Sequence, residues 1–205
     1  VCLSVNDKPS PLQQWDEKLD TPDQQIIKKD CQACAGKVSL DDNDSVAEDM
    51  EKIITFYCKT RNERYKLQNG WVEMLLPLMS LGLPIGVVYN LFYAMHSKYI
   101  PRECHDEGKP FHLFRLLVQY HDPELCSFLD SMKLFPDQYA QKWFRSLFAA
   151  TCDASVVEAM WDVYLLEEDP FLVFFLALVM IINARLRCGF VNLFIFSEAF
   201  LDVVK

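Results

Sequence analysis

The side chains in this sequence that could bind a metal are cysteines and histidines, and two groups of them have spacings that must be considered. Cys31-Gln32-Ala33-Cys34 has the spacing of paired metal ligands. A structural zinc site needs four ligands, and neither a second cysteine pair nor a His-x-x-x-His pair follows it. A looser group consists of Cys104, His105, His112, His121 and Cys126. We therefore expect no metal site and no cofactor, and we interpret both groups as loop and core residues.

The cysteines as a whole also point away from a disulfide framework. They are spread through apolar segments, at Cys2, Cys31, Cys34, Cys58, Cys104, Cys126, Cys152 and Cys188. No secretory signal opens the sequence. Buried free thiols in a cytoplasmic protein explain this pattern best.

The composition is that of a globular domain with an acid surplus. Of 205 residues, 51% are hydrophobic and 24% are charged, which is enough apolar mass for a full core. The presence of only six glycines argues against a glycine-rich phosphate loop and against a sandwich of strands joined by tight turns. A net charge of -9 makes the chain a poor ligand for nucleic acid or anionic lipid and a fair one for a basic peptide, although it can equally serve solubility alone.

Helices must position these residues, and the most apolar one is predicted over 171–182. Phe171 to Ile182 is an unbroken apolar run that follows Pro170 and three acidic residues, which suit a helix N-terminus. As a helix the run spans about 18 Å, too short for a bilayer. A helix that is apolar on all sides must be covered on all sides, so we expect the other helices to pack around it. A buried pair of strands is the alternative, because Val, Phe and Ile runs are ambiguous.

The rest of the chain has the apolar spacing of helices, and no segment alternates like a strand. Prolines open most segments, where a helix tolerates them. The expected helices cover 12–19, 21–31 from an N-cap at Thr21, 46–59 with a capping box at Ser45 and Glu48, 71–81 with a kink at Pro77, 85–99, 111–121, 123–132, a segment from Pro136 that holds Trp143 and Phe148, 154–166, 171–182, and a last one after Gly189 to Val204. The sequence therefore predicts an all-α fold of about ten or more helices.

Several of these segments together resemble the TBC (Tre-2/Bub2/Cdc16) domain family. The segments that carry the resemblance are Ile27-Lys28-Lys29-Asp30 and Tyr65 for the first half of that domain, and Trp143, Phe148, Trp161-Asp162, Leu165 and Pro170-Phe171 for the second. The resemblance covers nearly all of 1–205 and implies a single two-lobed multi-helix domain, with lobes of roughly 1–110 and 111–205. The family's earlier Arg-x-x-x-Trp motif has no counterpart, and we expect the sequence to begin just past it.

TBC domains typically activate GTP hydrolysis by Rab proteins, and the resemblance implies where that chemistry would lie. The family's arginine ends an Ile-x-x-Asp-x-x-Arg motif and its glutamine ends Tyr-x-Gln. The arginine meets charge on the transferring phosphoryl group, and the amide orients the attacking water. Here the motifs read Ile27-Lys28-Lys29-Asp30-Cys31-Gln32-Ala33 and Tyr65-Lys66-Leu67. Ala33 and Leu67 have no polar group for either task, so the resemblance implies vestigial finger positions and no catalytic residue.

Neighbouring residues could replace the fingers only if the backbone were remodelled. Gln68 lies one residue past the glutamine position, and one residue of slip on a helix turns a side chain by about 100°. Lys28, Lys29 or Arg64 could supply positive charge. The simpler interpretation is that the two finger positions are packed, and that the Asp and Tyr of the motifs remain for local hydrogen bonding.

The resemblance therefore favours an interaction module over an enzyme. Within the family, the chain is similar to a trans-Golgi adaptor that captures endosome-derived vesicles by binding the amphipathic N-terminal segment of golgins. This implies a cytoplasmic protein, peripheral at the trans-Golgi network and vesicles, with no nucleic-acid partner and no membrane span. The alternative is an active or weakly active GTPase-activating protein for a Rab. A third possibility is a domain that binds a Rab without stimulating it.

The residues expected to contact a partner surround the two finger positions. They are Asp30, Glu63, Tyr65 and Trp71, with the acidic loop of Asp41, Asp42 and Asp44 as a second choice. Each also has a plainer interpretation, since Trp71 suits a core position and isolated acidic residues are usually just solvated.

Overall fold

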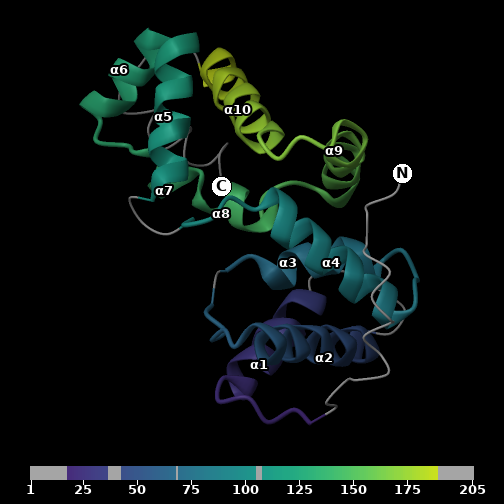
Figure 1. Cartoon of the computed structure of the whole chain (residues 1–205). Coiled ribbons are helices and arrows are strands. Elements are labelled where there is room, and N and C mark those ends of the chain that lie inside the picture. Colours follow the sequence, from purple (N-terminus) through teal and green to yellow (C-terminus); the bar gives the residue numbers. More distant parts are fainter. Residues whose placement is uncertain (1–17, 37–42, 68, 105–107, 189–205) are drawn as a thin grey trace.

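The described part of the protein is built from helices joined by short connections (Figure 1). The computed structural model describes residues 18–36, 43–67, 69–104 and 108–188. Ten helices and no strand occur in these ranges, so the predicted all-α fold is confirmed there. The helix predicted over 12–19 lies mostly outside the described residues, and the one after Gly189 lies entirely outside them.

Helix bounds follow the sequence pattern closely for much of the chain. The helices are α1 (Gln24–Ala35), α2 (Asn43–Arg61), α3 (Trp71–Met79), α4 (Ile85–Tyr99), α5 (Lys109–His121), α6 (Pro123–Ser131), α7 (Pro136–Tyr139), α8 (Gln141–Ser146), α9 (Ala154–Glu167) and α10 (Leu172–Cys188). The bounds of α4 are as predicted, and those of α5, α6 and α9 differ by one or two residues. The structure of α10 settles the choice between helix and strands at 171–182 in favour of the helix.

The first two helices begin at other residues than the sequence predicts. The N-cap of α1 is Asp23 in place of Thr21, and its main-chain oxygen accepts from the amides of Ile26 and Ile27 at 2.9 and 3.0 Å. The Asp23 side chain makes no capping bond because its carboxylate is used elsewhere. Helix α2 begins at Asn43, so Ser45 lies inside the first turn instead of capping it.

The segment after Pro136 forms two short helices where one was predicted. Helices α7 and α8 are separated at Ala140, and α8 ends at Ser146. Leu147 and Phe148 follow with φ of 47° and 70°, both in the left-handed region, so Phe148 lies beyond the helix. Both side chains are fully buried. The reversed backbone therefore ends the helix while both large side chains stay in the core.

Helix α10 is not the central helix that its apolar sequence predicts. Phe171 just before it is 57% exposed, and Phe175 and Val179 on α10 are 46% and 53% exposed. Helix α3 takes the central place, because it packs against α1, α2, α4, α8 and α9. An apolar run shows that a helix can be buried, but the number of its neighbours depends on the tertiary arrangement.

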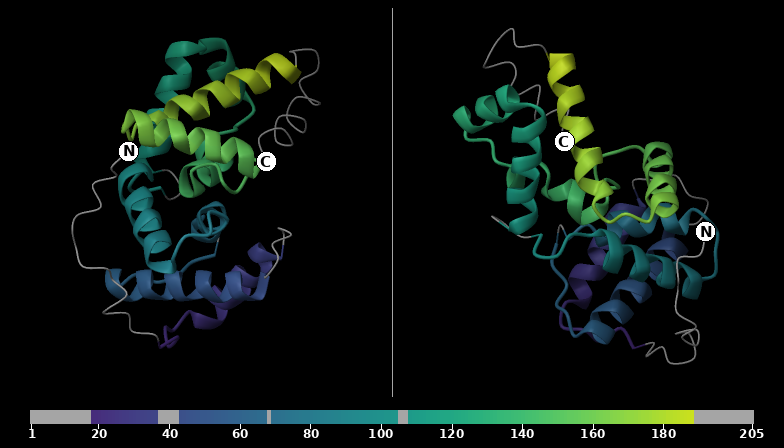
Figure 2. Two further views of the ribbon diagram at one scale, coloured as in Figure 1. Left: turned by 90° about the vertical axis from the view of Figure 1, so that its right-hand side faces the viewer. Right: turned by 45° about the horizontal axis from the view of Figure 1, so that its top comes forward.

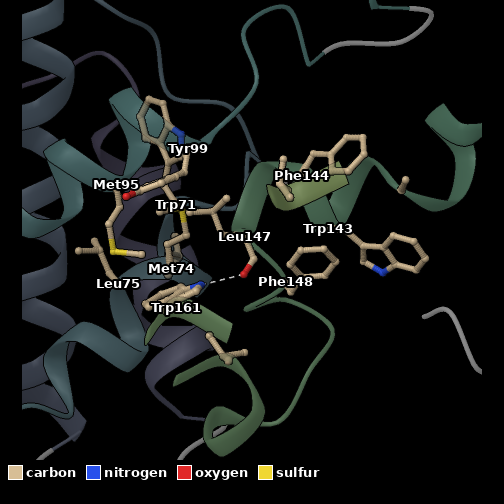
Figure 3. Packing of buried hydrophobic residues seen from close by; sticks show 14 of the residues in the cluster. Trp71, Met74, Leu75, Met95, Tyr99, Trp143, Phe144, Leu147, Phe148 and Trp161 are labelled. Atoms are coloured by element: carbon tan, nitrogen blue, oxygen red, sulfur yellow. Dashed lines mark hydrogen bonds between the residues drawn. The ribbon is translucent and has the colours of Figure 1, made fainter. Parts of the chain in front are cut away.

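Two groups of helices meet at α3 (Figure 1 and Figure 2). Helices α1 to α4 lie together, and α5, α6 and α10 lie on the far side of α8. Gly70, the N-cap of α3, has φ of 82°, and a Cβ atom there would lie 2.5 Å from the main-chain oxygen of Arg145 in α8. In Figure 3, Trp161 of α9 lies beside the side chains of α3. The junction is therefore a close contact of backbone and aromatic rings.

Candidate functional site

The two motif segments lie side by side because Tyr65 bonds to Asp30. The Tyr65 hydroxyl donates to the Asp30 carboxylate, which joins the connector after α2 to α1. The Tyr65 ring is buried and meets the ring of Trp71 edge-on, with centroids 5.8 Å apart. Burial raises the pKa of Tyr65, so the hydroxyl keeps its proton at neutral pH. The predicted local hydrogen bonding of Asp30 and Tyr65 is confirmed.

A second contact holds the connector at the start of α1. The Arg64 guanidinium donates from Nε and Nη2 to the two carboxylate oxygens of Asp23, each at 2.6 Å. The main-chain amide of Tyr65 donates to the same carboxylate at 3.2 Å. Arg64 lowers the pKa of Asp23 through these hydrogen bonds. We call this pair the Asp23–Arg64 clamp, and sequence reasoning missed it because its partners are 41 residues apart and no local spacing marks them.

Both finger positions are exposed, which corrects the expectation that they are packed. Ala33 lies on the outer side of α1. Leu67 is 59% exposed at the end of the connector. Neither residue is needed to fill the core, so packing does not account for their identity.

The residues that could replace the fingers are differently placed. Arg64 is engaged in the clamp, and Gln68 lies outside the described residues. Lys28 lines a groove between α1 and α2. Lys29 is exposed one helical turn before Ala33, on the same side of α1. A lysine there offers a point charge, without the planar fork of an arginine.

Two grooves flank this site and separate the acidic residues that the sequence singled out. The first, of about 380 Å³, lies between the start of α1 and the connector, and includes Glu63 and Tyr65. The second, of about 390 Å³, lies between α1 and α2 and includes Asp44. Asp41 and Asp42 lie outside the described residues. Asp44 and Glu63 therefore belong to different surfaces.

Trp71 is a core residue, which corrects its assignment as a partner contact. Its side chain is 6% exposed and packs edge-on against Tyr57 and His96, with ring centroids 5.0 and 5.4 Å away. Tyr65 is similarly buried, so it holds Asp30 in place and does not itself contact a partner. Of the predicted contact residues that the structure describes, Asp30, Glu63 and Asp44 can reach a partner.

The Cys31 and Cys34 side chains point into the protein from α1, and both are free thiols. Burial raises the pKa of the Cys31 thiol. Within 18–36, 43–67, 69–104 and 108–188, no three acidic, histidine or cysteine side chains come together as a metal site would require. In the same ranges no helix combines the length and hydropathy needed to cross a bilayer.

Comparison with known proteins finds one family along most of the chain. Residues 3–187 match the model of the Rab-GTPase-TBC domain. The chain is 29% identical over 90 residues to the TBC domain-containing protein kinase-like proteins of Homo sapiens and Gallus gallus, an overlap of 40% of this chain and 10% of each relative. It is 33% identical over 87 residues to the protein of that name from Dictyostelium discoideum, covering 42% of this chain and 8% of the relative. The chain therefore matches about a tenth of the length of these relatives.

Proposed function

Because the chain belongs to the Rab-GTPase-TBC domain family, we propose that it is a catalytically inactive member that works as a protein-interaction module. The observation that carries this proposal is the pair of exposed apolar residues, Ala33 and Leu67, at the two finger positions. The surrounding motif residues are held in place by the Asp30–Tyr65 bond and the Asp23–Arg64 clamp. The domain thus keeps its local structure while the polar tips are absent.

The loss of both tips removes the main source of rate acceleration. An arginine finger contributes about a thousandfold or more to GTP hydrolysis, and a glutamine orients the attacking water. Arg64 already donates two hydrogen bonds to Asp23, so its use as a finger would require breaking a charge-assisted pair. The site is therefore suited to binding without catalysis.

The partner in this proposal is the N-terminal amphipathic segment of a golgin, captured at the trans-Golgi network for tethering of endosome-derived vesicles. Segments 54–59, 99–102 and 110–117 are similar to those of the adaptor TBC domain family member 23, and this resemblance is the support for the golgin partner. The relatives described above are TBC domain-containing protein kinase-like proteins, which are other members of the family. The net charge of -9 suits a partly basic segment through electrostatic steering. Such a module acts in the cytoplasm, peripheral to the membrane.

The contact surface in this proposal is the groove at the connector, with Glu63 and Asp30 beside it. Glu63 is exposed, and together with Asp20 and Asp23 it sets three carboxylates against Lys59 and Arg64 around the groove. Asp20 and Asp23 are already paired with Lys59 and Arg64, so Glu63 is the carboxylate of this groove that a basic amphipathic segment could meet. Asp44 belongs to the neighbouring groove and would extend the contact only for a longer segment.

The second candidate is a Rab-binding domain with weak or no activation, and Lys29 is the residue that favours it. Its exposed ammonium group lies on the side of Ala33 and could meet a phosphate in place of arginine. A Rab bound in this way would be held without an amide to orient water. Binding to GTP-locked Rabs separates this candidate from golgin capture.

The first experiment measures GTP hydrolysis by a panel of Rabs with the domain at micromolar concentration. We expect acceleration of less than about tenfold, since neither finger is present. The matched variant Ala33→Arg/Leu67→Gln restores both tips on the exposed positions, and we expect it to accelerate at least one Rab. Acceleration by the unmodified domain beyond that limit would establish the alternative of an active GTPase activator.

The second experiment measures binding of synthetic golgin N-terminal peptides by fluorescence anisotropy. Glu63→Lys should weaken binding. Glu158→Lys, on the exposed side of α9, changes the net charge by the same amount but lies far from the groove, so it should leave binding unchanged. Absence of binding to every golgin peptide would sink the adaptor assignment. Equal weakening by both variants would mean that only the overall charge matters.

A further inference from the structure

We propose that a second surface of the domain binds an acidic amphipathic segment of another protein. This surface, the basic groove, lies where the end of α4, the start of α5 and the start of α10 meet, and has a volume of about 600 Å³. It is lined by Lys98, Tyr99, Arg102, Leu113, Phe171 and Phe174, among others. It shares no lining residue with the grooves at the finger positions, so the inference goes beyond the proposed function.

Two of the helices that form the groove, α5 and α10, run in the same direction. Leu113 in the first turns of α5 and Phe174 in the first turn of α10 line it together. At the other ends of these helices, Arg185 forms ion pairs with Asp122 and Glu124. Figure 1 shows α5 and α10 next to each other, and the two helices are in contact. The groove thus lies at the N-terminal ends of α5 and α10, and ion pairs join the two helices near their C-terminal ends.

Exposed apolar side chains extend from the groove along α10. Phe171, Phe175 and Val179 follow one another at intervals of four residues, and each is about half exposed. This spacing places them in one line on a helix, about 12 Å long. Leu113 and Leu116 are exposed on α5 one turn apart. A line of this length matches two turns of an amphipathic helix from a partner.

Positive charge is concentrated at the groove, on a chain that is otherwise acidic. Lys98, Arg102 and Lys109 line it with one acidic residue, Glu103, and Glu168 pairs with Lys98 from outside the lining, so three cations face two carboxylates. In the described parts of the chain Arg102 forms no ion pair or hydrogen bond, so its guanidinium is open to a partner. An acidic partner would meet cations here, whereas most of a surface with a net charge of -9 would repel it.

The existing ion pairs at the groove are weak enough to yield to a partner. Lys98 lies 3.4 Å from Glu168, and Lys109 lies 3.2 Å from Glu103, with every one of these side chains more than a third exposed. Exposed pairs of this kind contribute little to stability. A partner carboxylate can therefore replace either pair with little loss of stability in the domain.

The test is a selection from a displayed library of random peptides of about 16 residues, long enough for four helical turns. The folded domain is the target, and bound peptides are synthesised and measured by fluorescence anisotropy. We expect the selected peptides to combine Leu or aromatic residues at helical spacing with Asp or Glu. Amide shifts in NMR spectra of the labelled domain should then concentrate on α5 and α10.

Matched variants separate this surface from the rest of the molecule. Lys109→Glu should weaken binding by about tenfold or more, a loss of 1.4 kcal/mol or more, and Lys133→Glu, another exposed lysine, should leave it unchanged. Phe171→Ala should weaken binding similarly, and Leu166→Ala on α9 should not. All four positions are exposed, so we expect each variant to keep its melting temperature within a few degrees.

Several outcomes would overturn the proposal. Selected peptides that are basic or neutral, or that bind the Lys109→Glu domain as well as the unmodified one, would show that charge at the groove does not choose the partner. Enrichment of no peptide would do the same. Concentration-dependent dimerisation that is lost in Phe171→Ala would assign the surface to a second copy of this chain instead.

Discussion

The indole Nε1 of Trp161 donates a 2.9 Å hydrogen bond to the main-chain oxygen of Leu147, so α9 is bound to the left-handed turn that follows α8 (Figure 3). The Trp161 ring is buried. Trp161→Ala should lower the free energy of unfolding by about 3–5 kcal/mol, because it removes the transfer energy of the ring and leaves a cavity. Chemical denaturation measures the loss.

Two further variants divide this effect into its parts. Trp161→Phe keeps most of the ring but leaves the Leu147 oxygen without its donor, and should cost about 1–3 kcal/mol. Val163→Ala on the exposed side of the same helix should change the stability by less than about 0.5 kcal/mol. An unchanged free energy of unfolding for Trp161→Ala would show that the Trp161 ring does not contribute to the core.

Gly70 should be far more sensitive to substitution than Gly82. A Cβ atom there would lie within 2.8 Å of three main-chain atoms of Arg145 and Ser146, and the φ of 82° disfavours any L side chain. Gly70→Ala should therefore lower the free energy of unfolding by roughly 2–5 kcal/mol, through strain and overpacking together. Gly82 is the control, since its φ is 62° but no atom lies within 4 Å. Gly82→Ala should cost only about 1–2 kcal/mol, and equal losses at the two sites would contradict the close contact.

His96 should make the domain less stable at mildly acidic pH. Its Nδ1 lies 2.9 Å from the Tyr57 hydroxyl, and its ring packs on aromatic neighbours. Burial, with a smaller effect of Arg61, lowers the pKa of His96 to about 4 from 6.5. Between these values the unfolded chain binds a proton that the folded chain does not, so stability falls as pH falls from 6.5 toward 4. The loss should approach about 3 kcal/mol.

Urea unfolding at several pH values tests this, together with an NMR titration of the His96 ring. His96→Gln should have a flatter pH profile than the unmodified domain over that window, whereas His112→Gln, at an exposed position, should reproduce the original profile. A His96 resonance that titrates near pH 6.5 would contradict the prediction.

The Asp23–Arg64 clamp should keep the connector ordered at neutral pH. Asp23→Asn weakens the two bonds to Arg64 and the bond to the Tyr65 amide, so that amide should exchange its hydrogen faster and the melting temperature should fall. The pKa of Asp23 is lowered below its ordinary 3.8. The contribution of the Asp23 carboxylate to folding stability is thus present above pH 3.8, and it is lost as the pH falls through the lowered pKa of Asp23.

Asp20→Asn is the matched control, because the Asp20 carboxylate pairs with Lys59 at the same groove and is 62% exposed, against 12% for Asp23. It should leave the exchange of the Tyr65 amide unchanged. Equal exchange in Asp23→Asn and in the unmodified domain would mean that the connector is held by the buried Tyr65 ring alone.

The local sequence pattern was sufficient to predict those parts of the fold that depend on residues close together in the sequence. Pro84 and the apolar spacing after it predicted α4 to the residue, because a proline at a helix start and a single buried face are both local features. The resemblance predicted that Asp30 and Tyr65 remain for hydrogen bonding, but not that they bond to each other. The geometry of that bond follows from the packing of α1 against α2.

The failures share a dependence on distant residues. Asp23 stands at the N-cap of α1 without a side-chain capping bond, because Arg64 and Tyr65, more than 40 residues away, use its carboxylate. The break after α8 is fixed by burial of Leu147 and Phe148, which a helical pattern cannot show. Likewise, the sequence of α10 is apolar on every side, so it does not indicate which side of the helix is covered and which is exposed.

Trp71 illustrates the same limit at the candidate site. A tryptophan beside a motif can be a contact or a core residue, and only its neighbours decide. Here Tyr57, Tyr65 and His96 surround it. The acidic candidates were easier to place, because charged residues are seldom buried without a partner.

The tight approach of Gly70 to Arg145 has a practical consequence for anyone who dissects this domain. A fragment ending after α4 would leave the α3 start facing solvent where α8 now lies, and would also lose the Tyr164 main-chain oxygen that accepts from the Tyr99 hydroxyl at 3.0 Å. The complementary fragment would expose Trp161. Neither half should be soluble by itself, so deletion mapping of binding regions on this protein would report misfolding, and point substitutions on the intact chain are the sounder approach.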